Sequence, residues 1–229
     1  MPRSITMMWF GALVVCPFTA IITFIVTLFV CNGVQNSVSP QEKYPFISEL
    51  GTNRAYYYFA SGFIMLLPQV LLILIGRLQF LLQSQRIIRC TIIYIIHAFG
   101  FMACPFLLIM AIANVNDHPL AHDIGVNGLF LLIVTYCFLH TGLEFYLFSY
   151  RLKAPQHSNI IWPVWFLICS ILVLIFFIIW KSYNLSIPQY FAAAMPFLYF
   201  LGFVPQFWIQ ARKIKLNQFV DMFTDFKLT

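Results

Sequence analysis

The sequence predicts an all-α polytopic membrane protein, a bundle of six transmembrane helices with both termini in the cytosol. Three observations carry this prediction: an apolar composition, six long apolar stretches, and an uneven distribution of lysine and arginine between the connections. Of the 229 residues, 62% are hydrophobic and 9% are charged, and the mean hydropathy is +0.87. Because a soluble domain carries roughly 25% charged residues, this composition indicates an integral membrane protein.

Six stretches are long enough to cross a bilayer, which requires about 20 predominantly apolar residues in a helix. They lie at about 6–31, 55–82, 90–115, 124–150, 160–181 and 189–211. The first is too long for the apolar region of a signal peptide and lacks a small-residue cleavage site, so we expect a retained span. No other stretch is long enough for a soluble domain, which predicts a single transmembrane domain over 1–229.

The basic residues predict the orientation of the bundle. The N-terminus, second loop, fourth loop and tail hold ten of them: Arg3, Arg77, Arg86, Arg89, Arg151, Lys153, Arg212, Lys213, Lys215 and Lys227. The other three loops hold Lys43, Arg54 and Lys181. Cytosolic loops carry the excess of basic residues, so both termini are predicted to be cytosolic. The net charge of +6 then matches an anionic inner leaflet and does not indicate a nucleic-acid partner.

Polar residues interrupt the fourth apolar stretch at "CFLHTGLEFY", where His140 and Glu144 lie four residues apart on one helix face. Counting about 1.5 Å per residue from the basic ends of neighbouring spans places other polar side chains at similar depths: His97, Gln69 and Gln206. An ionisable residue inside a span costs on the order of 2.5–3.5 kcal/mol and faces the bundle interior or a wet cavity. We expect Glu144 to hydrogen-bond His97 or His140. Three roles stay open for the layer: contact between helices, a cavity for a lipid headgroup, or a proton relay.

Metal and catalytic signatures are weak in this sequence. The six cysteines form no C-x-x-C motif and no paired spacing, so neither disulfides nor a zinc site is predicted. His118 and His122 in "NVNDHPLAHD" lack a third ligand, and we expect a solvated loop in which Asp123 caps the fourth helix. No nucleophile elbow, phosphate-binding glycine loop or carboxylate pair is present. We therefore expect a non-catalytic protein without a cofactor, although an intramembrane enzyme stays open.

Two segments outside the spans carry further patterns. "YPFISELGT" alternates apolar and polar residues before a glycine, which predicts a short strand, an ordered lid over the bundle mouth, or a flexible loop. In the tail, apolar residues recur at helical spacing after a basic run, which predicts an amphipathic helix for membrane or partner docking, or a frayed tail. The residues that would dock are Arg212, Lys213, Lys215, Phe219, Phe223 and Phe226.

Two motifs resemble a known family. "YPFISELGT" resembles the signature P-x-I-S-[DE]-x-G-T in the first outer loop of the DRAM/FRAG/SFK family of six-span proteins, and "HDIGVNGLFLLIVTYCFLHT" resembles its fourth span. Relatives often have proline soon after the "GT", whereas "NRAYYY" follows here. The matching positions are Pro45, Ile47, Ser48, Glu49, Gly51, His122, Gly125, Tyr136 and His140.

The resemblance implies a role in membrane-lipid metabolism, with phospholipid or a glycosylphosphatidylinositol (GPI) anchor as the lipid partner. The compact chain is most similar to the GPI-remodelling branch, which implies the ER or Golgi. Three functions stay open: a lipid-recognition or lipid-guiding factor, a membrane anchor for a larger lipid-transfer or lipid-kinase assembly, and a proton-coupled transporter or channel that uses His97, His140 and Glu144.

Overall fold

A computed structural model describes residues 3–36 and 45–212. This part of the chain is helical and holds no strand, and six of its helices are long and apolar enough to cross a membrane. The predicted all-α, six-span fold is thereby confirmed. The amphipathic tail helix predicted after Arg212, with Lys213, Lys215, Phe219, Phe223 and Phe226, lies outside the described residues.

The helices follow the predicted apolar stretches closely. The elements in chain order are α1 (Arg3–Asn36), α2 (Ile47–Leu50), η1 (Asn53–Ala55), α3 (Tyr56–Ser84), α4 (Cys90–Ile112), α5 (Pro119–Ser149), η2 (Pro155–His157), α6 (Ile161–Tyr183) and α7 (Ser186–Leu201). After a turn at 202–203 the chain is helical again over 204–212.

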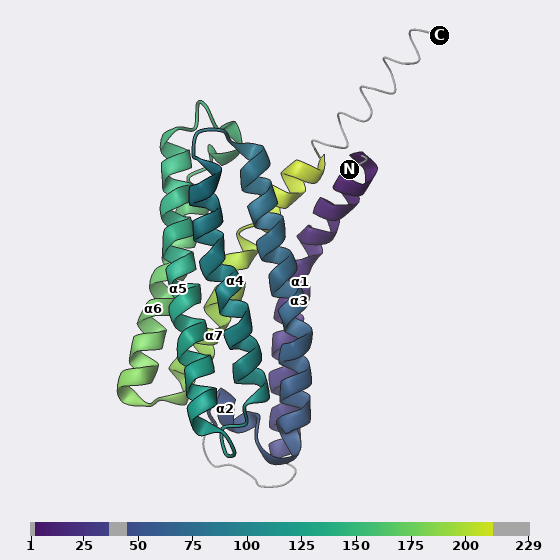
Figure 1. Cartoon of the computed structure of the whole chain (residues 1–229), viewed down its shortest axis with the longest axis vertical. Coiled ribbons are helices and arrows are strands. Elements are labelled where there is room, and N and C mark those ends of the chain that lie inside the picture. The colour runs from purple at the N-terminus through teal and green to yellow at the C-terminus, as the bar shows by residue number, and fades with distance from the viewer. Residues whose placement is uncertain (1–2, 37–44, 213–229) are drawn as a thin grey trace.

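Helices that follow one another in the chain pack side by side, α1 on α3 and then through α4, α5, α6 and α7, and a contact between α1 and α7 closes the bundle. The N-terminus, η2 and the helix over 204–212 lie at one end, which we call the terminal end (Figure 1). The short helix α2 lies at the other end, which we call the α2 end.

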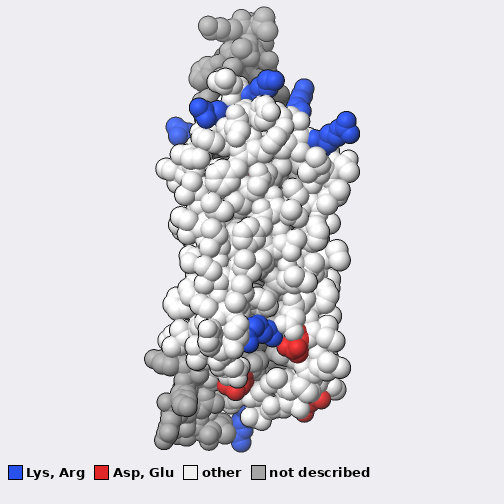
Figure 2. Space-filling model, turned by 90° about the vertical axis from the view of Figure 1, so that its left-hand side faces the viewer, with Lys and Arg blue, Asp and Glu red and all other residues white. Residues whose placement is uncertain are grey.

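Charged side chains lie toward these two ends, and the belt between them carries none on the face drawn in Figure 2. On the face drawn in Figure 2, lysine and arginine gather at the terminal end, the middle is free of charge, and the acidic residues lie toward the α2 end. One basic residue departs from the predicted distribution. Arg77, which the sequence assigns to the second loop, lies inside α3 and is completely buried. α3 continues to Ser84 because its apolar face persists beyond Arg77, with Phe80 and Leu81 buried.

The start of α5 differs from the prediction. Asp123 does not cap this helix, because α5 begins at Pro119 with His118 at the N-cap position. Proline favours the first helical position, where its missing N–H is not needed and its fixed φ suits the helix. The Asp123 side chain is 61% exposed and accepts a hydrogen bond from Lys181 on α6 at 3.1 Å. Of the segment predicted as a loop, 114–118 connects α4 and α5, whereas 119–123 forms the first turn of α5.

α4 and α5 approach most closely at Gly125. A Cβ atom at this position would lie 2.6 Å from the backbone nitrogen of Met110 and 3.0 Å from its Cα. Backbone atoms cannot rotate away as a side-chain end can, so only glycine fits unless the two helices separate. Gly142, about three-quarters of the way along the same helix, has open space at its Cβ position.

We predict that Gly125→Ala lowers the stability of the fold by roughly 1–3 kcal/mol, the usual effect of overpacking a tight contact. The matched control is Gly142→Ala, which should be neutral or stabilising by up to about 1 kcal/mol because alanine is the better helix former. Thermal unfolding in a mild detergent, followed by size-exclusion chromatography, measures both. Equal effects of the two substitutions would contradict the close approach of α4 and α5.

Candidate functional site

A buried arginine joins three helical segments near the terminal end. The Nε–H group of Arg77 donates to Nε2 of His140 at 2.8 Å, and its two terminal nitrogens donate to Gln206 and to Glu144. All four side chains are 2% exposed or less. The positive charge of α3 is therefore matched by one carboxylate of α5, and an amide from the helix over 204–212 completes the contact.

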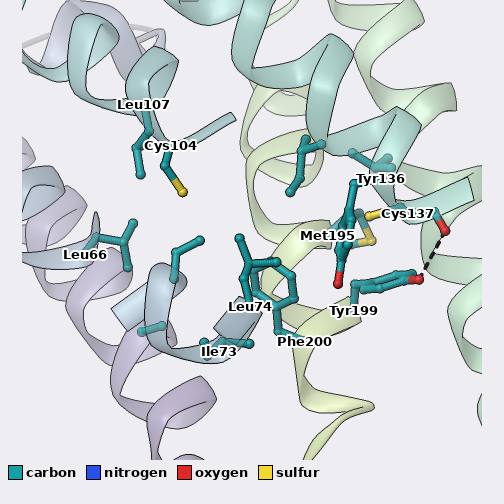
Figure 3. Packing of buried hydrophobic residues seen from close by; sticks show 14 of the residues in the cluster. Leu66, Ile73, Leu74, Cys104, Leu107, Tyr136, Cys137, Met195, Tyr199 and Phe200 are labelled. Atoms are coloured by element: carbon teal, nitrogen blue, oxygen red, sulfur yellow. Dashed lines mark hydrogen bonds between the residues drawn. The ribbon is translucent and has the colours of Figure 1, made fainter. Parts of the chain in front are cut away.

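The hydrogen bonds fix the tautomer of His140. Because Nε2 accepts from Arg77, the proton resides on Nδ1, which donates to the hydroxyl of Tyr199 at 2.7 Å. Tyr199 in turn donates to the carbonyl oxygen of Cys137 at 3.1 Å, the dashed line in Figure 3. A directed chain of hydrogen bonds thus runs from α3 through α5 to α7 and back to α5.

The second oxygen of Glu144 ties in the connection between α5 and α6. It accepts a hydrogen bond from Nδ1 of His157 on η2 at 3.2 Å, and Nε2 of His157 lies 3.0 Å from the hydroxyl of Ser84. The guanidinium carbon of Arg77 also lies 4.7 Å from the ring centre of Phe203, a distance at which a cation is attracted to an aromatic face. We call Arg77, His140, Glu144, His157 and Gln206 the Arg77 cluster.

The structure brings together some, but not all, of the residues of the predicted polar layer. His140, Glu144 and Gln206 come together, but around Arg77, and Glu144 bonds Arg77 and His157 instead of His97. The rings of His97 and Tyr136 contact that of His140, with centroids 6.1 and 5.6 Å away. Gln69 does not join the layer, because its amide donates to Thr23 on α1 at 3.0 Å.

Sequence reasoning missed both Arg77 and His157. A signal for Arg77 existed, since "LLILIGRLQFLL" is apolar on both sides of the arginine. No pattern in the sequence indicated His157, because its role depends on where the connection after α5 folds back. The guanidinium of Arg77 and the carboxylate of Glu144 are hydrogen-bonded to each other and to other members of the cluster, which favours a structural contact between helices among the three roles predicted for the layer.

A cavity of about 90 Å³ lies between the Arg77 cluster and the α2 end. All six spanning helices and α2 line it, mostly with apolar side chains that include Phe63, Leu66, Leu107, Ile133, Trp180 and Phe200. Leu66, Cys104 and Leu107 point into the interior of the bundle from α3 and α4 (Figure 3). A void of this kind excludes water and accepts apolar groups.

The polar residues that line this cavity come from the α2 end: Ser48, His122 and Gln189. His122 is 5% exposed, and its Nδ1 lies 2.8 Å from the carbonyl oxygen of Ala113, so Nδ1 is the donor. Its Nε2 is left as an acceptor, buried and without a hydrogen-bond partner among the described residues. The cavity therefore has an apolar body and a polar end, at which Nε2 of His122 is an unused hydrogen-bond acceptor.

The segment around α2 covers this polar end as an ordered lid. It is a helical turn and not the strand that alternation predicted, because the Glu49 side chain accepts the N–H of Phe46 at 2.8 Å and caps the turn. The N–H of Ile47 donates to Gln189 of α7 at 2.8 Å. Gln35, in the last turn of α1, donates to the hydroxyl of Thr52 at 2.8 Å.

The remaining motif positions of this segment also have packing roles. Pro45 accepts a hydrogen bond from the Tyr190 hydroxyl at 3.0 Å. A Cβ atom at Gly51 would lie 2.7 Å from the ring of Phe59, so the turn needs glycine to lie against α3. The motif thus holds the lid against α1, α3 and α7.

No metal site is formed by the described residues, which contain no group of three or more His, Cys, Asp or Glu side chains placed to share an ion. His118 is exposed at the end of the α4–α5 connection whereas His122 is buried inside α5. The two histidines therefore face different surroundings.

We predict that Glu144→Gln and Arg77→Met each lower the stability by about 3–5 kcal/mol, because each leaves a charge or a polar partner buried without its counterpart. The double variant Arg77→Met with Glu144→Gln should lose less than the sum of the two single losses, since it removes both charges together. Thermal unfolding in detergent measures this double-mutant cycle.

The exposed pair Lys181–Asp123 is the matched control for this cycle. Lys181→Met and Asp123→Asn should each change the stability by less than about 1 kcal/mol, as for other exposed ion pairs. Strictly additive losses at Arg77 and Glu144 would show that the buried ion pair does not hold the helices together.

Residues 1–210 match the family model described as the Frag1/DRAM/Sfk1/Cwh43P N-terminal domain. No curated protein and no solved structure matches the chain. The matched region contains all six spanning helices, the lid, the cavity and the Arg77 cluster. The chain therefore belongs to the Frag1/DRAM/Sfk1/Cwh43P N-terminal domain family of membrane proteins.

Proposed function

We propose that this protein recognises a membrane lipid, with an acyl chain in the cavity and a headgroup at the lid, and serves in lipid remodelling. One observation carries the proposal: His122 lines the apolar cavity inside the bundle, and its buried Nε2 has no hydrogen-bond partner among the described residues. A molecule that fills both parts has a hydrocarbon chain and a polar end, which is the chemistry of a lipid.

The size of the cavity fits part of a chain. One water needs roughly 10–15 Å³ of such space, so about 90 Å³ accommodates several methylene groups in a row. Each buried methylene group contributes about 0.8 kcal/mol when it leaves water, but a lipid chain comes from hydrocarbon. The affinity must therefore come from close packing and from the polar end, as it does between helices in a membrane.

The polar end favours a headgroup that donates hydrogen bonds. Because Nδ1 of His122 donates to Ala113, Nε2 accepts, and the partner it lacks is a hydroxyl or an N–H group. Ser48 and Gln189 line the same end. We propose a GPI lipid or a phospholipid with a hydroxyl-bearing headgroup, in line with the resemblance to the GPI-remodelling branch and with an ER or Golgi location.

A second function, anchoring a larger lipid-handling assembly, is favoured by the surface of the terminal end. Arg151 and Lys153 are exposed there, and Leu152 between them is 97% exposed. An apolar side chain flanked by two cations fits an acidic partner surface with an apolar pocket, or an anionic leaflet. We place this end in the cytosol, which the gathering of basic residues there supports (Figure 2).

Proton-coupled transport has less support, because His140 and Glu144 are both bonded to Arg77.

We predict that Ala193→Phe, which fills the cavity from α7, removes the lipid that co-purifies with the protein. Ala193 lines the cavity, and a phenyl group there would take the space of the acyl chain. Purification in a mild detergent followed by mass spectrometry of bound lipids measures the change, and we expect a loss of about tenfold, equivalent to roughly 1.4 kcal/mol.

The matched control for this experiment is Ile171→Phe, on the exposed side of α6. It should leave the bound lipid unchanged, because it adds similar bulk outside the bundle. An unchanged lipid complement in a folded Ala193→Phe protein would refute lipid binding in the cavity. A stoichiometric protein partner in the same preparation would support the anchoring function.

A further inference from the structure

A groove runs along the outside of the bundle between α1 and α7, toward the α2 end. Its volume is about 490 Å³, and its walls are apolar on both sides: Phe24, Leu28 and Phe29 from α1, and Ile187, Phe191 and Ala194 from α7. Pro45 and Leu50 on either side of the lid turn close its end, together with the polar residues Asn32 and Tyr190.

The position of the groove determines what fills it. α1 packs on α3 and α7 packs on α6, so the groove follows the contact that closes the ring of helices. Phe29, Ile187 and Phe191 are 78, 54 and 48% exposed and belong to helices that span the membrane. These side chains therefore face lipid hydrocarbon, and the occupant is an acyl chain.

Phe24 connects the lining of the groove with that of the cavity. Phe24 is the residue that lines both spaces, and its ring lies 4.9 Å from that of Phe197, which lines the cavity. On α7, Ala193 faces the cavity and Ala194 faces the groove. The lid likewise contributes to both, with Ile47 and Ser48 at the cavity and Pro45 and Leu50 at the groove.

We propose that the α1–α7 groove is a second lipid-chain site and the lateral route by which a lipid reaches the cavity, with Phe24 as the gate. A phenylalanine ring moves aside by rotation of its side chain, without breaking a backbone hydrogen bond. The lipid headgroup then moves along the lid, from Asn32 and Tyr190 at the groove toward His122. This inference rests on the proposed lipid binding in the cavity and adds the route to it.

The test measures how fast a labelled lipid reaches the cavity. The full-length protein in nanodiscs is mixed with vesicles of phosphatidylcholine that carry a trace of phosphatidylcholine with a photoreactive diazirine in its acyl chain. Samples are irradiated at increasing times, and mass spectrometry quantifies labelled peptides that contain the cavity residues Leu107 and Ile133. The labelling rate reports access and the final level reports occupancy.

Two substitutions should change the rate at which the cavity is labelled, and Ala194→Trp, which lies outside the cavity, should leave the final level unchanged. Ala194→Trp obstructs the groove and should slow labelling of the cavity by about tenfold. Phe24→Ala removes the gate and should accelerate labelling by about two- to tenfold, which is the change in rate that corresponds to the loss of one aromatic pair, here Phe24 with Phe197. If Ala194→Trp does not fold, Leu28→Trp adds the same bulk from the α1 side of the groove.

The outcomes separate the route from the site. Wild-type rates in folded Ala194→Trp and Leu28→Trp proteins, with labelling lost in Ala193→Phe, would overturn the route and leave cavity binding intact. Cavity labelling that resists Ala193→Phe would overturn the proposed function itself. A dimer in native mass spectrometry that Ala194→Trp dissociates would assign the groove to a second copy of the chain, and would also overturn the route.

Discussion

A charged arginine is tolerated inside a membrane-spanning bundle only when its charge and its hydrogen-bond donors are matched, and the rest of this structure depends on how Arg77 meets that requirement. Glu144 neutralises it, His140 and Gln206 each accept one further N–H group, and all of these partners are buried. These bonds join α3, α5 and the helix over 204–212 near the terminal end. Lipid tails are as apolar as the helix surfaces, so polar contacts of this kind specify which helices meet and at what height.

Polar contacts hold the α2 end as well, where Gln189 accepts from the lid and Gln35 donates to it. The stretch between the two ends is packed by apolar side chains, and there the cavity lies. Under the proposed function this division separates stability from recognition: we expect substitutions in the Arg77 cluster to act on the fold and substitutions at the cavity to act on lipid binding. The groove between α1 and α7 follows the contact that closes the ring of helices and ends at the lid.

The six helices could be predicted from the sequence alone, because crossing a bilayer requires a long apolar run and these runs are well separated. The sequence also brought His140, Glu144 and Gln206 to one depth, since residue counts along a helix measure height well. The height of Gln69 was counted from Arg77 as the edge of the span, and because Arg77 lies inside α3 beside His140, Gln69 lies about 12 Å from that level. Its amide instead donates to Thr23 on α1. Arg77 was taken for a loop residue because an arginine near the end of a span ordinarily marks the membrane edge, and only its partners on other helices reveal its burial. A strand was among the predictions for the lid, because its residues alternate in polarity. Four residues of alternating polarity also fit one helical turn, which the Glu49 cap stabilises.

The most direct test of lipid recognition between the two polar ends is a cryo-electron microscopy structure of the full-length protein in nanodiscs of native lipid. The polar contacts at Arg77 and at the lid should be present together, with elongated density in the cavity that ends within hydrogen-bonding distance of Nε2 of His122. A cavity that is empty or filled by rearranged side chains, with Nε2 of His122 bonded to the protein, would contradict lipid recognition at this site.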